Sequence, residues 1–308
     1  NIDKIIFTPI TSPATRVAAM LSGEIDFTNN APLQDLPRLQ ASGDLKVLAT
    51  NELRTVFYLF NWGDKLQEDG AGGKNPFRDP KVREALYRAI DIDGLQKKVM
   101  RGLSRNTGSM VAPAIPGFAP TLDPRLAYDP EKAKALLAEA GYPGGFPFAF
   151  VCANDDYINE EQLCQATAAM WSRVGLKPKI DIAPSSQQTA KYEGGKFDIA
   201  ILGWANEPML DSYSILVQVV HSKSGTAGVF NWGGWQPEGV DALIDQAGQT
   251  LDRPTRLGYQ TQALQILHDQ SIFLPLHQQP MAWATGRKIA SVLQLSDNKA
   301  RHWLTMMQ

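Results

Sequence analysis

The sequence predicts an α/β fold. Apolar runs of strand length alternate along the chain with segments in which apolar residues recur every three or four positions. The first pattern is typical of buried strands and the second of amphipathic helices, and their alternation is typical of sheets covered by helices. The two strongest strand patterns, at 55–61 and 271–284, stand on either side of the long middle region. They predict an inserted lobe joined to the rest of the chain by a pair of crossover strands.

Strands are expected where β-branched and aromatic residues gather between turn signals. Residues 55–61, with the sequence Thr-Val-Phe-Tyr-Leu-Phe-Asn, show this most strongly. The expected strands are 4–10, 25–28, 45–50, 55–61, 148–152, 177–182, 197–202, 273–277 with a continuation at 281–284, a strand-like apolar edge at 289–295, and 301–306.

Helices are expected where an apolar stripe follows a capping signal. Asp129-Pro130 places an acid at the cap and a proline at the first helical position, and Asp79-Pro80 has the same form. Prolines at 113, 116, 120 and 124 predict a loop over 104–129. The expected helices are 16–21, 32–41, 81–90, 95–103, 130–140, 159–174, 186–192, 237–246 and 256–269.

Composition limits the classes of protein to which the chain can belong. The chain has 308 residues, of which 44% are hydrophobic, and a net charge of −2. This length suits one large or two medium domains with a sizeable core. The balanced charge gives no indication of nucleic acid or of an anionic membrane surface as a partner. No apolar run approaches the ~20 residues of a spanning helix, so membrane insertion is not expected.

The chain shows no pattern typical of a catalytic or metal centre. Four histidines, at 221, 268, 277 and 302, are scattered without metal-ligand spacing. No Gly-x-Ser-x-Gly elbow occurs, and the glycines at 70–73 are not followed by the residues of a phosphate-binding loop. We expect no catalytic residues, no metal and no cofactor. Glu160 and Glu161 are interpreted as acids that favour a helix start.

One stretch is typical of a ligand site. The apolar run Phe197–Leu202 is followed by Gly203-Trp204 and then by Asn206, Glu207 and Asp211. Open α/β sheets bind ligands beyond the carboxyl ends of their strands. Trp204 offers an apolar wall, and the polar residues offer hydrogen bonds and negative charge. The alternative is a core tryptophan with solvated acids. A second aromatic turn contains Asn231 and Trp232, and it is either a stacking surface or a packed turn.

Four motifs carry a family resemblance. They are Leu-Ser-Gly-Glu-Ile-Asp at 21–26, Asn-Pro-Phe-Arg-Asp-Pro-Lys-Val-Arg-Glu-Ala-Leu at 75–86, Ala-Lys-Ala-Leu-Leu-Ala-Glu-Ala-Gly-Tyr at 133–142, and Phe-Asp-Ile-Ala at 197–200 with Gly203-Trp204. In these the chain resembles the family 5 extracellular solute-binding proteins, which serve ABC importers of oligopeptides, dipeptides, nickel and opines. The resemblance covers essentially the whole chain.

The resemblance implies a type II, cluster C, periplasmic-binding-protein-like architecture. The chain is similar to the C-terminal portion of the family. On this interpretation residues 1–55 and 287–308 are a remnant of the first lobe, and residues 56–286 are the complete second α/β lobe. A start inside a strand pattern agrees with a fragment or a processed form.

The resemblance also implies a function. We expect a monomeric, non-enzymatic, periplasmic or otherwise extracytoplasmic protein that closes two lobes on a peptide or peptide-like solute. It would deliver that solute to the ABC permease subunits in the membrane. The alternative from another class is an α/β hydrolase that uses Glu207 or Asp211 as acid or base.

The resemblance names candidate residues. In peptide-binding members an Asp a few residues after Gly-Trp often holds the α-amino group of the ligand. That place is Glu207 here, and Asp211 is the nearest Asp. The expected ligand-binding residues are Trp204, Asn206, Glu207, Asp211, Asn231 and Trp232.

The two cysteines, Cys152 and Cys164, lack metal-ligand spacing and could form a disulfide or remain two buried thiols. The extracytoplasmic location that the resemblance implies favours the disulfide.

Overall fold

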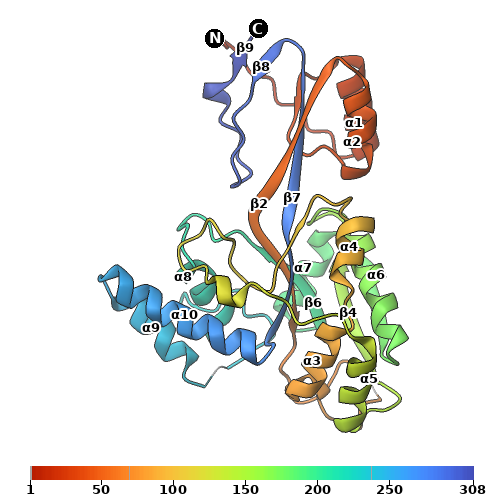
Figure 1. The fold of residues 1–308 in the computed structure, drawn as a ribbon, viewed down its shortest axis with the longest axis vertical. Coiled ribbons are helices and arrows are strands. Elements are labelled where there is room, and N and C mark those ends of the chain that lie inside the picture. The colour runs from red at the N-terminus through yellow and green to blue at the C-terminus, as the bar shows by residue number, and fades with distance from the viewer. Residues whose placement is uncertain (1, 69, 237) are drawn as a thin grey trace. The chain divides into compact units, whose positions relative to one another are not determined.

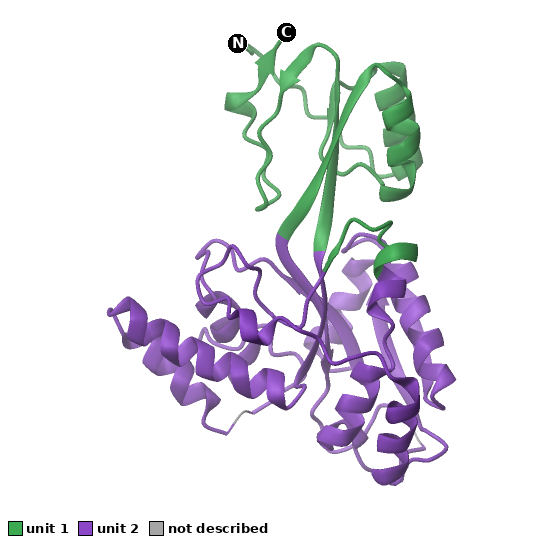
Figure 2. Ribbon diagram, in the orientation of Figure 1, with its two compact units in different colours: residues 1–52, 96–105, 279–308 green, residues 53–95, 106–278 purple. Residues whose placement is uncertain are grey.

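The computed structural model describes residues 2–68, 70–236 and 238–308. The chain forms two compact units, which are coloured separately in Figure 2. Unit 1 consists of residues 1–52, 96–105 and 279–308, and unit 2 of residues 53–95 and 106–278. The strands β2 (Leu45–Phe60) and β7 (Phe273–Gly286) each contribute residues to both units (Figure 1).

Unit 1 contains short elements around the outer halves of these strands. α1 (Pro13–Ser22) begins where the Ser12 hydroxyl accepts a hydrogen bond from the Thr15 amide at 3.3 Å, and it ends at Gly23, whose φ of 75° suits glycine. β1 (Phe27–Thr28) pairs antiparallel with β7. The remaining elements are η1 (Leu33–Asp35), α2 (Leu36–Ala41), β8 (Ile289–Ser291), η5 (His302–Leu304) and β9 (Met306–Met307).

The predicted strand at 4–10 is not formed. Residues 4–10 adopt no regular structure, and Ile5, Ile6 and Phe7 are 56%, 75% and 85% exposed. A strand needs a neighbour for its amide and carbonyl groups, and this segment pairs with no described strand. The prediction at 301–306 is also largely wrong, because a 3-10 turn occupies 302–304 and only Met306–Met307 pair, with β8. The two strands expected at 45–50 and 55–61 are one strand, β2.

Unit 2 is built on a mixed sheet in the order β7-β2-β6-β4-β5. β4 (Pro147–Ala153) runs parallel to both β5 (Lys177–Ala183) and β6 (Ile199–Trp204). The connections are α6 (Glu160–Arg173) and α7 (Ser185–Glu193), which give the βαβ pattern of a parallel sheet. β2 pairs antiparallel with β6, with Thr55 opposite Trp204. β3 (Arg105–Asn106) pairs with β7.

Side chains on β2 show that both faces of this sheet are covered, because successive strand residues point to opposite faces. Phe57 packs edge-on against Phe273 within a core that includes residues of η4, α9 and α10. Tyr58 packs against Phe150 and Trp171 instead, and its hydroxyl donates to Thr167 at 2.9 Å.

Two helices of unit 2 begin at the predicted caps. α3 (Pro80–Arg88) and α5 (Pro130–Glu139) begin after the side chains of Asp79 and Asp129, which accept backbone amides of the first turn. Pro237, the first residue of the helix predicted at 237–246, lies outside the described residues. The further elements are η2 (Pro76–Arg78), α4 (Ile92–Lys98), η3 (Pro120–Leu122), α8 (Tyr213–Ile215), the π-helical turn η4 (Leu216–Val220), α9 (Val240–Gln249) and α10 (Arg253–Asp269).

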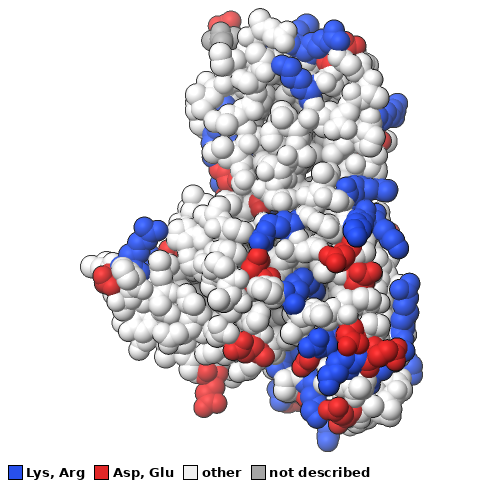
Figure 3. Space-filling view, viewed as in Figure 1, with Lys and Arg blue, Asp and Glu red and all other residues white. Residues whose placement is uncertain are grey.

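Charges of both signs are interspersed over the α3 and α5 region on the face drawn in Figure 3. Ion pairs such as Lys81–Glu139 at 3.0 Å and Lys134–Glu131 at 2.8 Å lie there, so neither sign dominates. None of the helices in the described part of the chain combines the length and the apolar character that crossing a membrane requires.

Candidate functional site

The candidate site lies at the edge of unit 2 where β4 and β6 end. Because these strands are parallel, their carboxyl ends meet at one edge of the sheet. The loop at 154–159 follows β4 and the loop at 205–212 follows β6. The second loop contains three of the predicted residues, Asn206, Glu207 and Asp211.

Gly203 brings two unpredicted side chains to this edge. A Cβ at Gly203 would lie 2.7 Å from Tyr157 Cε1 and 2.9 Å from Arg54 Cδ, so only glycine leaves room for both. Arg54 Nη1 donates to the Gly203 carbonyl at 3.0 Å, and its guanidinium carbon lies 5.8 Å from the Tyr157 ring centre. The sequence signal that could have found this pair is a glycine inside a strand, which marks a close approach.

Four aromatic rings form a continuous series, which we call the aromatic face. Trp204 lies 5.1 Å from Phe230, Phe230 lies 5.6 Å from Trp232, and Trp232 stacks on Tyr192 at 5.1 Å with an interplanar angle of 15°. Trp204, Phe230 and Trp232 are partly exposed, and Tyr192 is buried. The structure therefore brings both predicted tryptophans together and adds two rings that the sequence analysis missed.

Trp204 is fixed in this face by a hydrogen bond. Its indole Nε1 donates to the Ser214 hydroxyl at 3.1 Å, which places one edge of the ring against α8. Its apolar surface packs partly on the core of unit 2. A partly exposed, oriented indole of this kind suits stacking on a flat ligand group.

Asn206 is a buried residue that holds the loop after β6 by hydrogen bonds. It is fully buried with φ of 59°, and its side-chain oxygen accepts the Ile215 amide at 3.3 Å. Its carbonyl accepts the Leu210 amide at 2.8 Å. Glu207 follows it, partly exposed, before a cis peptide bond to Pro208. Of the two residues, Glu207 is the more exposed, although its Oε1 is buried.

Asp211 is engaged with its own chain. Its Oδ1 accepts the Tyr213 amide at 2.8 Å and the Gln260 side chain at 2.9 Å, and its Oδ2 lies 3.0 Å from Arg256 Nη2. The side chain is only 14% exposed. These contacts tie the 205–212 loop to α10 and neutralise the carboxylate, so its geometry suits a structural role better than contact with a solute cation.

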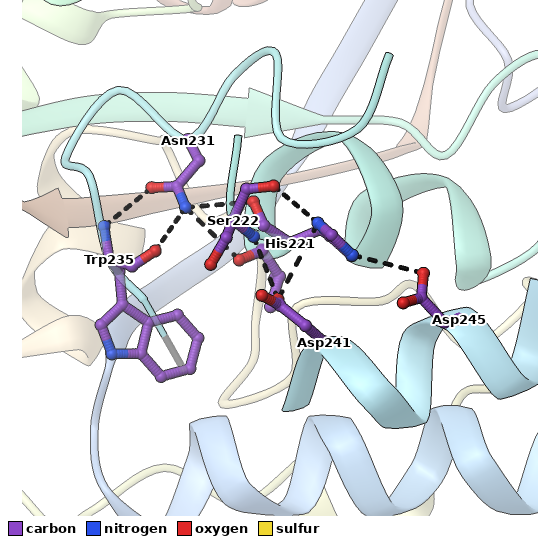
Figure 4. Close-up of polar contacts among 7 residues, drawn as sticks. His221, Ser222, Asn231, Trp235, Asp241 and Asp245 are labelled. Carbon is purple, nitrogen blue, oxygen red and sulfur yellow. Dashed lines mark hydrogen bonds and ion pairs between the residues drawn. The ribbon is translucent and has the colours of Figure 1, made fainter. Parts of the chain in front are cut away.

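Asn231 is also internal. Its Nδ2 donates to the Trp235 carbonyl at 2.7 Å and to the His221 carbonyl at 3.1 Å, and its Oδ1 accepts the Trp235 amide at 3.0 Å (Figure 4). The side chain is buried. It closes the turn that carries Trp232.

The loop after β4 is held by a disulfide and a buried acid. Cys152 and Cys164 are joined, with their Cα atoms 6.7 Å apart, so the end of β4 is tied to α6. Glu160 Oε1 accepts the Ala153 amide at 2.6 Å, and Oε2 accepts the Tyr157 amide at 3.1 Å. Glu160 is 1% exposed, so it holds the loop after β4 from inside in addition to lying at the helix start that the sequence indicated.

Burial sets the protonation of several groups near this edge. Burial raises the pKa of Glu160 to about 8, and the backbone amides that it accepts oppose that shift. Burial also raises the pKa of Asp156, against the attraction of Arg54. On β7, burial lowers the pKa of His277 to about 3, so this interior histidine is neutral.

The raised pKa of Glu160 predicts that the free energy of unfolding depends on pH. Its pKa in the folded chain, about 8, lies above its ordinary value of 4.5. Its contribution to stability is therefore complete below about pH 4.5 and is lost as the pH rises through about 8. We expect the free energy of unfolding to fall over this range in wild type and to fall less in Glu160→Gln, as measured by urea unfolding followed by circular dichroism.

At pH 5 the same variant should be less stable than wild type by about 1–3 kcal/mol, because glutamine keeps one acceptor oxygen for two buried amides. A matched control is Glu161→Gln, since Glu161 is the next residue of the same helix and is partly exposed. Parallel pH profiles for wild type and Glu160→Gln would show that Glu160 does not titrate as described.

Among the described residues, no group of three His, Cys, Asp or Glu side chains is arranged to hold a metal ion. The edge instead combines rings, a guanidinium and a carboxylate, which are groups that bind an organic solute.

Comparison with known proteins identifies the family. A profile described as bacterial extracellular solute-binding proteins, family 5 Middle, matches residues 1–227. The glutathione-binding protein GsiB from Escherichia coli (strain K12) is 25% identical over 302 residues, which cover 96% of this chain and 56% of that protein. The chain thus spans about half the length of the curated relatives that it matches.

Solved structures agree on the fold. NikA from Staphylococcus aureus, in complex with Ni(L-His)2, has a TM-score of 0.80 at 18% identity and covers 97% of this chain and 61% of its own. DppA from Helicobacter pylori, in complex with the peptide STSA, has a TM-score of 0.76 at 22% identity, and the match covers 91% of this chain and 52% of the DppA chain. The predicted α/β, type II periplasmic-binding-protein-like architecture is confirmed.

The relatives are solute-binding proteins rather than enzymes, so the hydrolase alternative is not retained. The motifs around Gly203-Trp204, the mixed sheet of unit 2 and the match over residues 1–227 agree. The chain belongs to the family 5 bacterial extracellular solute-binding proteins.

Proposed function

We propose that this chain is the C-terminal portion of an extracytoplasmic, monomeric solute-binding component of an ABC importer. It binds a peptide or peptide-like solute and delivers it to the permease subunits in the membrane. The observation that carries the proposal is the presence of the aromatic face, the Glu207 loop and Arg54 at the ends of β4 and β6 in a family 5 fold.

The groups at this edge fit the chemistry of such a solute. Trp204 and Trp232 offer flat apolar surface for a side chain or a planar amide. Glu207 offers negative charge to an ammonium group, and the Arg54 guanidinium offers positive charge to a carboxylate. Among the relatives, GsiB is named for glutathione and the DppA structure contains a peptide, which supports the peptide class.

We further propose the lobe assignment made from the sequence, with residues 56–286 as the second lobe and residues 1–55 and 287–308 as part of the first. The division between the two compact units falls nearby, at 52/53 in β2 and at 278/279 in β7. Residues 96–105 cluster with unit 1, although this proposal gives them to the second lobe.

Calorimetry with three solutes tests the proposal: glutathione, the peptide STSA and Ni(L-His)2. We expect the intact protein to bind glutathione or the peptide without cleaving it. We expect the 308-residue chain to bind it about 100-fold more weakly, because one lobe covers a solute on one side only and pockets normally bury most of a ligand. Binding of the nickel complex alone would refute the peptide class, and cleavage of a bound peptide would refute a pure binding role.

A further inference from the structure

His221 lies between two acids of one helix. It follows η4 and is 7% exposed. Its Nδ1 is 2.6 Å from the Ser222 carbonyl oxygen and its Nε2 is 3.3 Å from Asp245 Oδ1. Asp241 Oδ1 lies 3.9 Å from Nδ1. Asp241 and Asp245 are one turn apart on α9 and approach the ring from the same helix, as Figure 4 shows.

Nδ1 of this ring is held by the neighbouring backbone. A carbonyl oxygen only accepts hydrogen bonds, so Nδ1 donates to the Ser222 carbonyl at 2.6 Å. Nε2 is buried and forms no hydrogen bond with the described residues, although Asp245 Oδ1 lies 3.3 Å away. Tyr213, whose ring centre lies 5.8 Å from the Arg256 guanidinium carbon, is a further titratable group near Asp245.

The same network reaches the aromatic face. Asp241 Oδ1 also accepts the Ser222 amide at 3.0 Å, which fixes the backbone beside His221. The His221 carbonyl accepts from Asn231, whose side chain closes the turn to Trp235. Phe230 and Trp232 flank Asn231 in the chain, so the turn that presents both rings is anchored through His221 to α9.

Backbone contacts confine this turn from its other side. The Gly228 amide donates to the Val217 carbonyl at 2.8 Å, and the Phe230 amide donates to the Gln218 carbonyl at 2.8 Å. A Cβ at Gly228 would lie 2.3 Å from the His221 carbonyl oxygen, so this approach requires glycine. The segment 221–235 is therefore a closed loop with its position set by η4 and α9.

We infer that His221 and Asn231 are positioning residues of the solute site. The His221 ring lies between the Ser222 carbonyl and Asp245, and Asn231, which donates to the His221 carbonyl, sets the positions of Phe230 and Trp232. The inference rests on the proposed function for its effect on binding. The positioning itself is measurable without any solute.

The test uses the 308-residue chain labelled with 5-fluorotryptophan, which gives one fluorine resonance for each of the seven tryptophans. His221→Gln and Asp245→Asn should both move the Trp232 and Trp235 resonances and leave that of Trp171 in place. Asp245 is 61% exposed, so Asp245→Asn should fold even if His221→Gln does not.

The matched control is His268→Gln, because His268 also contacts an aspartate, Asp269, at 3.2 Å but lies on α10. It should leave the Trp232 resonance unmoved. An unmoved Trp232 resonance in folded Asp245→Asn, or an equal shift in the control, would overturn the inference. In the intact protein, His221→Gln should weaken glutathione binding on the order of tenfold. If wild type binds no solute, the proposed function fails while the NMR result still stands.

Discussion

Replacing Trp204 by alanine in the intact protein is expected to weaken solute binding by about 2 kcal/mol or more, which is about 30-fold in Kd. The indole is partly exposed, held by Ser214 and in contact with Phe230. Removing it would take away the proposed stacking surface and open the aromatic face to water. Calorimetric titration with the solute that wild type binds measures the loss.

The control for this prediction is Trp303→Ala, which removes a 77% exposed tryptophan from unit 1 and should leave affinity unchanged. A Trp204→Ala protein that is less stable but binds as tightly as wild type would mean that Trp204 serves packing alone.

Two carboxylate variants separate charge recognition from structure. Glu207→Gln should weaken binding of a solute with an ammonium group, because glutamine keeps the size of the side chain and removes its negative charge. Asp211→Asn should instead lower the melting temperature, since it disrupts the contact with Arg256 at 3.0 Å. If Glu207→Gln binds as well as wild type, the acidic part of the proposed site is wrong.

Removing the disulfide by Cys152→Ala and Cys164→Ala is expected to lower the free energy of unfolding by about 3 kcal/mol. The bond closes a loop of twelve residues, and a loop of this length restricts the unfolded chain by about that amount. Urea unfolding followed by circular dichroism measures the difference. Wild type in the presence of dithiothreitol should show a similar loss.

The same variant should also loosen the loop that carries Tyr157, because the disulfide fixes β4 to α6 on either side of it. Single cysteine variants serve as controls and should be as unstable as the double variant. Two titratable thiols in denatured, unreduced wild type would show that the bond is absent in solution.

The sequence by itself determined the elements whose signals are local. Asp79-Pro80 and Asp129-Pro130 predict the starts of α3 and α5. In each case the capping oxygen accepts a hydrogen bond from a backbone amide no more than three residues away, so the signal is local. The apolar run before Gly203-Trp204 predicts β6 and the position at which this strand ends. The motifs at these places were also sufficient to indicate the family and its α/β architecture.

Only the tertiary structure decided which predicted side chains face outward. Asp211 has the composition of a ligand residue, but its partners Gln260 and Arg256 lie on α10, whose approach no local pattern encodes. Arg54 and Tyr157 meet over Gly203 from segments that are far apart in the chain. Residues 4–10 have a strand pattern but no described neighbour to pair with. In each case the deciding contact is long-range, and its energy depends on the burial and distance that the fold sets rather than on neighbouring residues.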